Sequence, residues 1–126
     1  MTCVWKGLIK ALNLQMKPVE LLRTLQENNM KTLDVLWNGR ALTSQNYKEN
    51  IEHIKGLKIG QLNKGYDCSA CDPLLLLVAQ VYGVSIDHVY NETLIRYTNK
   101  KSRKVIKVKS DLGHFWSERN QKRNHN

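Results

Sequence analysis

The chain has no apolar run of membrane-spanning length, and its 126 residues include only three cysteines, two prolines and one phenylalanine. A helix that crosses a bilayer needs about 20 consecutive apolar residues, so we expect no membrane partner. The start, Met1 to Trp5, lacks the charged and then apolar layout of a signal peptide. Three cysteines are an odd number and too few for a disulfide framework. We therefore expect a cytoplasmic protein with free thiols.

Acidic residues are also scarce, with 11 Asp and Glu against 20 Lys and Arg. Residues 1–98 carry 11 basic and 9 acidic side chains, whereas residues 99–126 carry 9 basic and 2 acidic ones. Such a cluster can attract nucleic acid, an anionic membrane or an acidic protein face, or it can simply be a solvated hairpin followed by a disordered tail. We expect one domain over residues 1–118 and a basic, disordered tail over residues 119–126.

The first half of the chain has helical patterns. Apolar residues at helical spacing predict a first helix from Cys3 to Leu14, mostly buried, and Pro18 suits the first turn of a second helix that ends at Asn28. Residues 32–37 form a short strand or a loop, with a turn at Asn38 and Gly39. Ser44 is a candidate cap for a third helix that Gly56 ends.

The second half predicts one more helix and then strands. Asp72 as N-cap and Pro73 just inside it announce a helix that is apolar nearly all round up to Gly83, so we expect it to be deeply buried. Residues 85–90, 92–98 and 103–109 are rich in Val, Ile, Tyr and Thr at strand length. The fold class is therefore α+β, with the N-terminal helices packed on a small antiparallel β-sheet.

Two short elements at opposite ends of the chain suggest chemistry. Cys3 stands where the first predicted helix begins, in Thr2-Cys3-Val4-Trp5, and His114 lies in Gly113-His114-Phe115-Trp116. Unpaired N–H groups and the partial positive charge of a helix N-terminus favour the thiolate over a thiol whose free pKa is about 8.5. A histidine brought close by folding would complete a Cys-His dyad for acyl transfer. Cys3 and His114 are therefore the candidate catalytic residues.

The order of these elements resembles that of papain-like cysteine proteases, and most closely the small ovarian-tumour-type (OTU) deubiquitinases and their viral relatives. The resemblance runs from Thr2 to about Ser117. The middle of the chain, from residues 68–73 through 82–86 to 105–108, supplies the buried helix and the strands that lead to the histidine. It implies a papain-like, OTU-like fold. It also implies a peptidase that cleaves peptide or isopeptide bonds of ubiquitin or a ubiquitin-like protein, without a cofactor.

By resemblance, each site residue receives a role. Cys3 would be the nucleophile, with its backbone N–H in an oxyanion hole, and His114 would be the general base. Trp116 would form a wall of the cleft and orient the imidazole. Asp111 and Glu118 are the neighbouring candidates for a third member, although some viral relatives use a dyad alone. A viral protein of this kind would act in the host cytoplasm, could cut its own polyprotein, and would blunt innate signalling by removing modifiers.

Alternatives to this interpretation stay open. Cys68 and Cys71 form a C-x-x-C pair, which is half of a zinc site or a redox dithiol, and Cys71 is a second candidate nucleophile because it precedes the helix capped by Asp72. No second metal-binding pair follows, so buried or loop thiols are the simpler interpretation. The protein could also be a non-catalytic basic module, derived from a protease fold, that binds RNA or another protein through Lys100 to Lys109 and the tail. A zinc-stabilised adaptor is a third possibility.

Overall fold

The computed structural model describes residues 4–62, 65–111 and 114–117, and within them the chain is an α+β protein, as its sequence predicts. The elements in chain order are the helices α1 (Val4–Leu12) and α2 (Pro18–Glu27), the strand β1 (Val35–Trp37), the helix α3 (Ser44–Lys55), a 3-10 turn η1 (Ile59–Gln61), the helix α4 (Pro73–Tyr82) and the strands β2 (Ser85–Tyr90), β3 (Thr93–Asn99), β4 (Val105–Asp111) and β5 (His114–Ser117). The described residues share one hydrophobic core.

The helix boundaries follow local signals in the sequence. Pro18 occupies the first turn of α2, and Asp72 caps α4 by accepting hydrogen bonds from the backbone N–H groups of Leu74 (2.9 Å) and Leu75 (3.4 Å). Gly83 ends α4 in the left-handed conformation (φ 63°), which glycine adopts without strain. The predicted cap of α3 is wrong by one residue, because the Thr43 hydroxyl accepts the hydrogen bond from the Asn46 N–H and Ser44 is already helical.

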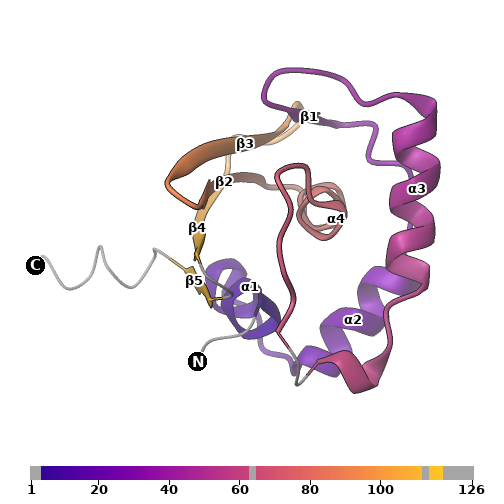
Figure 1. Ribbon diagram of the computed structural model, residues 1–126, viewed down its shortest axis with the longest axis vertical. Helices are drawn as coiled ribbons and strands as arrows, with labels where there is room; N and C mark the ends of the chain where they lie inside the picture. Colours follow the sequence, from indigo (N-terminus) through magenta and orange to yellow (C-terminus); the bar gives the residue numbers. More distant parts are fainter. Residues whose placement is uncertain (1–3, 63–64, 112–113, 118–126) are drawn as a thin grey trace, which may run out of the picture.

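Helix α4 lies in the middle of the molecule (Figure 1), with the sheet curving around one side of it and α2 and α3 on the other. Its residues Leu74 to Ala79 are at most 1% exposed, so the prediction of deep burial is confirmed. Burial on every side explains why this helix has no polar stripe. Helix α1 lies beside β4 and β5 at one end of the sheet, and it is mostly buried as predicted, but α4 is the enclosed helix.

The sheet has the strand order β1-β3-β2-β4-β5 and is mixed, so the prediction of a purely antiparallel sheet is wrong in one pairing. Strands β2 and β4 are parallel, with Ile86 opposite Ile106 and His88 opposite Val108, whereas the other three pairings are antiparallel. The physical reason is that β1 already occupies the free edge of β3. Strand β4 therefore crosses to the far edge of β2, where it runs in the direction of β2.

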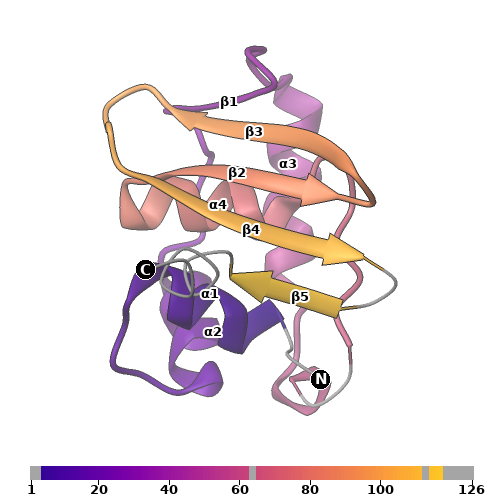
Figure 2. The same ribbon diagram turned by 90° about the vertical axis from the view of Figure 1, so that its left-hand side faces the viewer.

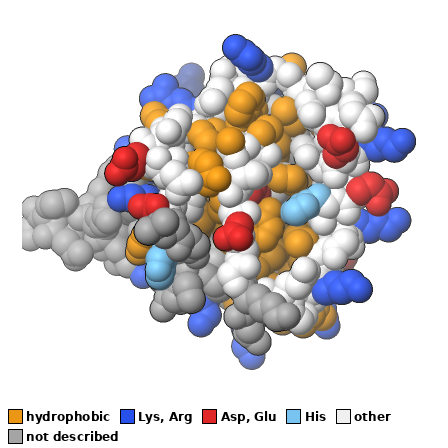
Figure 3. Space-filling model, viewed as in Figure 1, with side chains coloured by type: hydrophobic (Ala, Val, Ile, Leu, Met, Phe, Trp, Pro, Cys, Tyr) orange, Lys and Arg blue, Asp and Glu red, His pale blue; other side chains and the backbone are white. Residues whose placement is uncertain are grey.

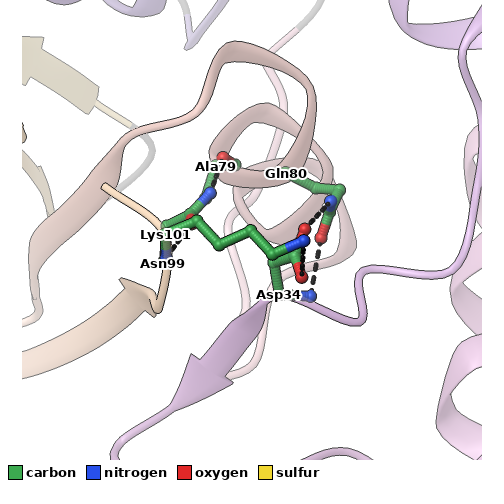
Figure 4. Close-up of polar contacts among 5 residues, drawn as sticks. All are labelled: Asp34, Ala79, Gln80, Asn99 and Lys101. Carbon is green, nitrogen blue, oxygen red and sulfur yellow. Dashed lines mark hydrogen bonds and ion pairs between the residues drawn. The ribbon is translucent and has the colours of Figure 1, made fainter.

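A polar cluster holds β1, α4 and the turn between β3 and β4 together (Figure 4). The Gln80 side chain donates to the Asp34 carboxylate (2.9 Å) and accepts from the Asp34 backbone N–H (2.9 Å), while Lys101 Nζ lies 3.4 Å from the same carboxylate. The Asn99 side chain donates to the Ala79 carbonyl and accepts from the Lys101 N–H, both at 2.9 Å. These bonds fix the position at which β4 leaves the turn.

One face of the sheet packs on the helices and the other is open. Figure 2 looks onto this outer face, and no described helix crosses it. Exposure alternates along β3 and β4, with Ile95, Tyr97, Ile106 and Val108 buried and their neighbours exposed. The alternation continues in β5, where Phe115 and Ser117 face inward and His114 and Trp116 face outward. Within the described residues, no helix combines the length and apolar character that crossing a membrane requires.

Candidate functional site

The candidate site begins where α1 meets β5. Val4, the first described residue of α1, is 1% exposed, and Trp5 and Leu8 are equally well buried. The helix packs on β5 and β4 (Figure 2). At the closest point, a Cβ atom added to Gly7 would overlap the ring of Phe115, with Cε1 at 2.8 Å. The first turn of α1 is therefore held directly against Phe115, whereas the side chain of the neighbouring His114 faces the other side of the sheet.

His114 begins β5 on the outer face of the sheet. Its ring stacks on Trp116, with centroids 5.6 Å apart and planes inclined by 25°. Lys109 Nζ lies 5.9 Å from the centroid of the Trp116 ring, from the strand next to it. Asp111 is the cross-strand partner of His114 in the β4–β5 pairing. Three predicted site residues, His114, Trp116 and Asp111, therefore lie together at this end of the sheet.

The other predicted site residues are placed differently or lie outside the described residues. Cys3 and Glu118 are not among the described residues, and neither is the segment 119–126 for which we predicted a basic tail. Cys3 directly precedes Val4 in the chain, and Glu118 directly follows Ser117 of β5. Cys68 and Cys71 lie in the loop that leads to α4.

The C-x-x-C pair consists of free, half-buried thiols. Burial raises the pKa of Cys68 and of Cys71, and the nearby Asp72 carboxylate raises both further. Both effects disfavour the negatively charged thiolate. Both side chains are therefore thiols at neutral pH. Among residues 4–62, 65–111 and 114–117, no group of three or more His, Cys, Asp or Glu side chains could hold a metal ion. The zinc hypothesis thus gains no further ligand from this part of the chain.

A hydrogen-bond network around Asp72 joins the loop before α4 to the sheet. The buried Asp72 carboxylate accepts hydrogen bonds from the Tyr66 hydroxyl (3.0 Å) and the Ser69 N–H (2.8 Å), and the Tyr97 hydroxyl accepts from the Asp72 N–H (2.9 Å). Burial raises the pKa of Asp72, and these donors oppose the rise. Trp37 adds an anchor from β1, because its indole N–H donates to the Ala70 carbonyl at 2.8 Å.

A pocket of about 460 Å³ opens between this loop and the ends of the strands. Residues 66–68 of the loop, 90–92 of the β2–β3 turn and 110–111 of β4 line it, and we call it the strand-end pocket. Three of its lining residues, Asp67, Glu92 and Asp111, are acidic in a chain whose net charge is +9. Because Asp111 is also the partner of His114, the pocket adjoins the candidate site.

Figure 3 shows the face of the molecule seen in Figure 1. Hydrophobic side chains gather across its middle, and acidic and basic side chains lie around the rim. The loop before α4 crosses in front of α4 on this face (Figure 1), and its Tyr66, Cys68 and Cys71 are only partly buried hydrophobic residues that pack against the core. An apolar surface therefore lies beside the strand-end pocket.

Sequence reasoning missed the burial of His88, which lies in β2. His88 is fully buried, its Nε2 lies 2.7 Å from the Ser110 hydroxyl, and its Nδ1 has no hydrogen-bond partner among the described residues. Its ring packs between those of Tyr97 and Phe115. Burial lowers the pKa of His88 to about 4, so the imidazole is neutral at pH 7. The period-two alternation of Ile86, His88 and Tyr90 was the signal that could have placed it inside.

Comparison of the chain with protein-family models, with curated proteins and with solved structures finds no match in any of the three.

Proposed function

We propose that this protein is a papain-like, OTU-like cysteine peptidase in which Cys3 is the nucleophile and His114 the general base. The observation that carries the proposal is the packing of α1 on β5. Gly7 follows Cys3 by four residues, Phe115 follows His114 by one, and Gly7 and Phe115 are in direct contact. Cys3 directly precedes α1 in the chain and His114 begins β5, so the two candidates, 111 positions apart in the sequence, are each followed closely by a residue of this contact.

The proposed reaction needs no cofactor. His114 takes the thiol proton, and the sulfur of Cys3 attacks the carbonyl carbon of the scissile bond. The resulting imidazolium then gives its proton to the leaving amine, which departs and leaves a thioester. Water, deprotonated by His114, hydrolyses the thioester and restores the thiol. Backbone N–H donors at the start of α1 would stabilise the oxyanion in both steps.

The environments of the other two cysteines support this assignment. A nucleophilic cysteine needs a lowered pKa or an adjacent base, whereas burial and the Asp72 carboxylate raise the pKa of both Cys68 and Cys71. Cys71 precedes a helix, but that helix start is already occupied, because the Asp72 carboxylate accepts the N–H groups of Leu74 and Leu75. Cys3 is therefore the preferred nucleophile of the three.

Two neighbours of His114 are suited to orient its ring. Trp116 stacks on the imidazole, and this contact would restrict the rotation of the ring. Asp111 faces His114 across the β4–β5 pair, so it is the described carboxylate best placed to act as a third member. Glu118 stays an alternative for that role.

We infer that the substrate is ubiquitin or a ubiquitin-like conjugate, on the resemblance alone, and that the reaction takes place in the cytoplasm. Two surfaces suit a protein substrate. The strand-end pocket beside His114 can take a side chain near the scissile bond, and its three carboxylates favour a basic or neutral side chain over an acidic one. The apolar surface shown in Figure 3 is suited to contact the folded part of a substrate.

The test is covalent labelling with a ubiquitin probe that carries a cysteine-reactive group at its C-terminus. We expect a wild-type adduct on Cys3 that Cys3→Ala abolishes and His114→Ala strongly slows. The matched controls are Cys68→Ser and Cys71→Ser, which should still form the adduct. An adduct that maps to Cys71, or one that persists in Cys3→Ala, would remove Cys3 from the mechanism. Absence of any adduct with a folded wild-type protein would count against ubiquitin as substrate. A panel of ubiquitin-like probes would then be tested, and failure of all of them to label Cys3 would contradict the peptidase proposal.

A second candidate function is that of a non-catalytic binding module. The observation that favours it is the open outer face of the sheet, on which Arg96, Lys107 and Lys109 lie. This function does not require Cys3.

A further inference from the structure

No element of the described residues 4–62, 65–111 and 114–117 covers the outer face of the sheet, and this face is basic. Its three central strands place side chains in register, so that Arg96, Asp87 and Lys107 form one row across β3, β2 and β4. The next row contains Leu94, Val89, Lys109 and Trp116, and it extends to β5. Leu94, Val105 and Trp116 are among the most exposed large hydrophobic residues, at 45%, 48% and 38%. Basic side chains and exposed apolar side chains are therefore interspersed on this surface.

Two of the basic side chains near this face are already neutralised. Arg96 pairs with Asp87 (3.9 Å), and Lys101 pairs with Asp34 (3.4 Å; Figure 4). Among the described residues, Lys107, Lys109, Arg103 and Lys104 form no ion pair within 4.0 Å, although Lys109 lies over the ring of Trp116. The unneutralised charge thus follows β4 and the turn that leads into it.

These side chains form a line. Residues on one face of a strand are about 6.6 Å apart, so Lys109 and Lys107 follow each other at that spacing along β4, and the exposed Arg103 lies in the loop just before the strand begins. Trp116 stands beside the Lys109 end of that line, with more than a third of its surface exposed. A linear series of cations with an exposed aromatic ring beside it is the arrangement by which proteins bind a single-stranded nucleic acid, with cations along the phosphates and a base stacked on the ring.

We propose that the outer face of the sheet is a binding site for single-stranded RNA, with Lys107, Lys109 and the turn 103–104 along the phosphates and Trp116 against a base. Charge complementarity selects this occupant, because the face offers cations in a row and an aromatic platform rather than a closed apolar groove. Asp111 follows Lys109 on the same face and limits the site at the His114 end, since a carboxylate repels phosphate. The site shares Trp116 with the proposed peptidase site, but its phosphate contacts involve neither Cys3 nor His114.

The test is fluorescence anisotropy of a labelled single-stranded oligoribonucleotide, titrated with the full chain at several salt concentrations. Binding should weaken steeply with salt, and Lys107→Gln/Lys109→Gln should reduce the slope of log affinity against log salt by about 1.4, at about 0.7 for each phosphate contact. Trp116→Ala should weaken binding roughly tenfold with little change in that slope, because stacking does not release counterions. The matched control is Lys48→Gln/Lys55→Gln, which removes the same charge from exposed positions of α3 on the other side of α4.

Three outcomes would overturn the proposal. The first is absence of RNA binding at low salt, and the second is an equal loss of RNA affinity in the α3 control variant. The third is full competition by polyglutamate at the same charge concentration, which would show that the face binds acidic proteins instead. Cys3→Ala should bind RNA like the wild type. Failure of RNA binding therefore leaves the peptidase proposal intact, and failure of the probe reaction leaves the RNA site intact.

Discussion

Gly7 of α1 lies so close to the ring of Phe115 in β5 that no side chain fits between them. Gly7 is the residue at which the first helix and the last described strand meet, and Phe115 is the only phenylalanine in the chain. A glycine inside a helix costs about 1 kcal/mol relative to alanine. Here that cost has a packing reason, because the close approach brings the start of α1 against the strand that carries His114.

Gly7→Ala should therefore destabilise the protein by about 1–3 kcal/mol, the usual range for overpacking, despite the higher helix propensity of alanine. Thermal unfolding should show a decrease in Tm of several degrees. Gly56→Ala is the matched control, because the nearest atom to its added Cβ would lie at an ordinary 3.5 Å. Adding Phe115→Leu to Gly7→Ala should recover part of the loss. Equal Tm values for the two alanine variants would contradict the close packing of α1 on β5.

The buried His88 makes stability depend on pH. Its folded pKa of about 4 lies below its ordinary value of 6.5, so the unfolded chain binds a proton that the folded protein excludes. Stability should be complete above pH 6.5 and should fall as pH decreases toward 4. Because each pKa unit corresponds to about 1.4 kcal/mol, the loss is on the order of 3 kcal/mol. Urea unfolding at several pH values measures it.

The control for this prediction separates His88 from the other titrating groups. His88→Leu should flatten the stability curve between pH 6.5 and 4. A wild-type slope that persists in His88→Leu would show that another group excludes the proton.

Asp72 and Thr43 both cap helices, but we expect very different costs when the cap is removed. Thr43 is exposed and accepts one capping bond, so Thr43→Ala should cost about 1 kcal/mol. Asp72 is fully buried and also accepts from Tyr66 and Ser69, so Asp72→Ala leaves several buried donors unpaired and should cost more than about 3 kcal/mol. Urea unfolding of both variants gives the comparison. Similar costs would mean that the Asp72 network contributes little.

The raised pKa values of Cys68 and Cys71 predict slow alkylation. At pH 7 iodoacetamide should modify both thiols far more slowly in the folded protein than in urea, because the thiolate is the reacting form and burial disfavours it. Mass spectrometry of the labelled peptides follows each cysteine separately. If Cys71 in the folded protein is labelled as fast as an unfolded thiol, it is a reactive cysteine, and it would again be a candidate for the nucleophile.

The features that the sequence predicted well are local ones. Asp72, Pro73 and Gly83 define α4 through their own backbone preferences, and residues 85–90 form β2 with the predicted bounds. The strand order was not predictable in this way, because it depends on the pairing of β1 with β3, which are about 60 residues apart. The same holds for the strand-end pocket, which three separate segments build.

In the candidate site too, the local features were predictable from the sequence and the contacts between distant segments were not. His114, Trp116 and Asp111 are neighbours in sequence and lie together in one hairpin, so their grouping followed from proximity in the chain. The contact of Gly7 with Phe115 joins the two ends of the chain, and no local pattern specifies it. The burial of His88 was visible in the alternation of β2, but a histidine between an aspartate and a valine has no composition signal of a core residue.

The pairing of α1 with β4 and β5 has a consequence for synthesis on the ribosome. Helix α1 is synthesised about 100 residues before the strands on which it packs, so Val4, Trp5 and Leu8 have no β5 partner until residue 117 has left the exit tunnel. A domain whose first helix packs on its last strands cannot complete its fold until those strands have been synthesised. If Cys3 and His114 act together as proposed, the nascent chain becomes active only after residue 117 has left the tunnel and β5 has docked on α1.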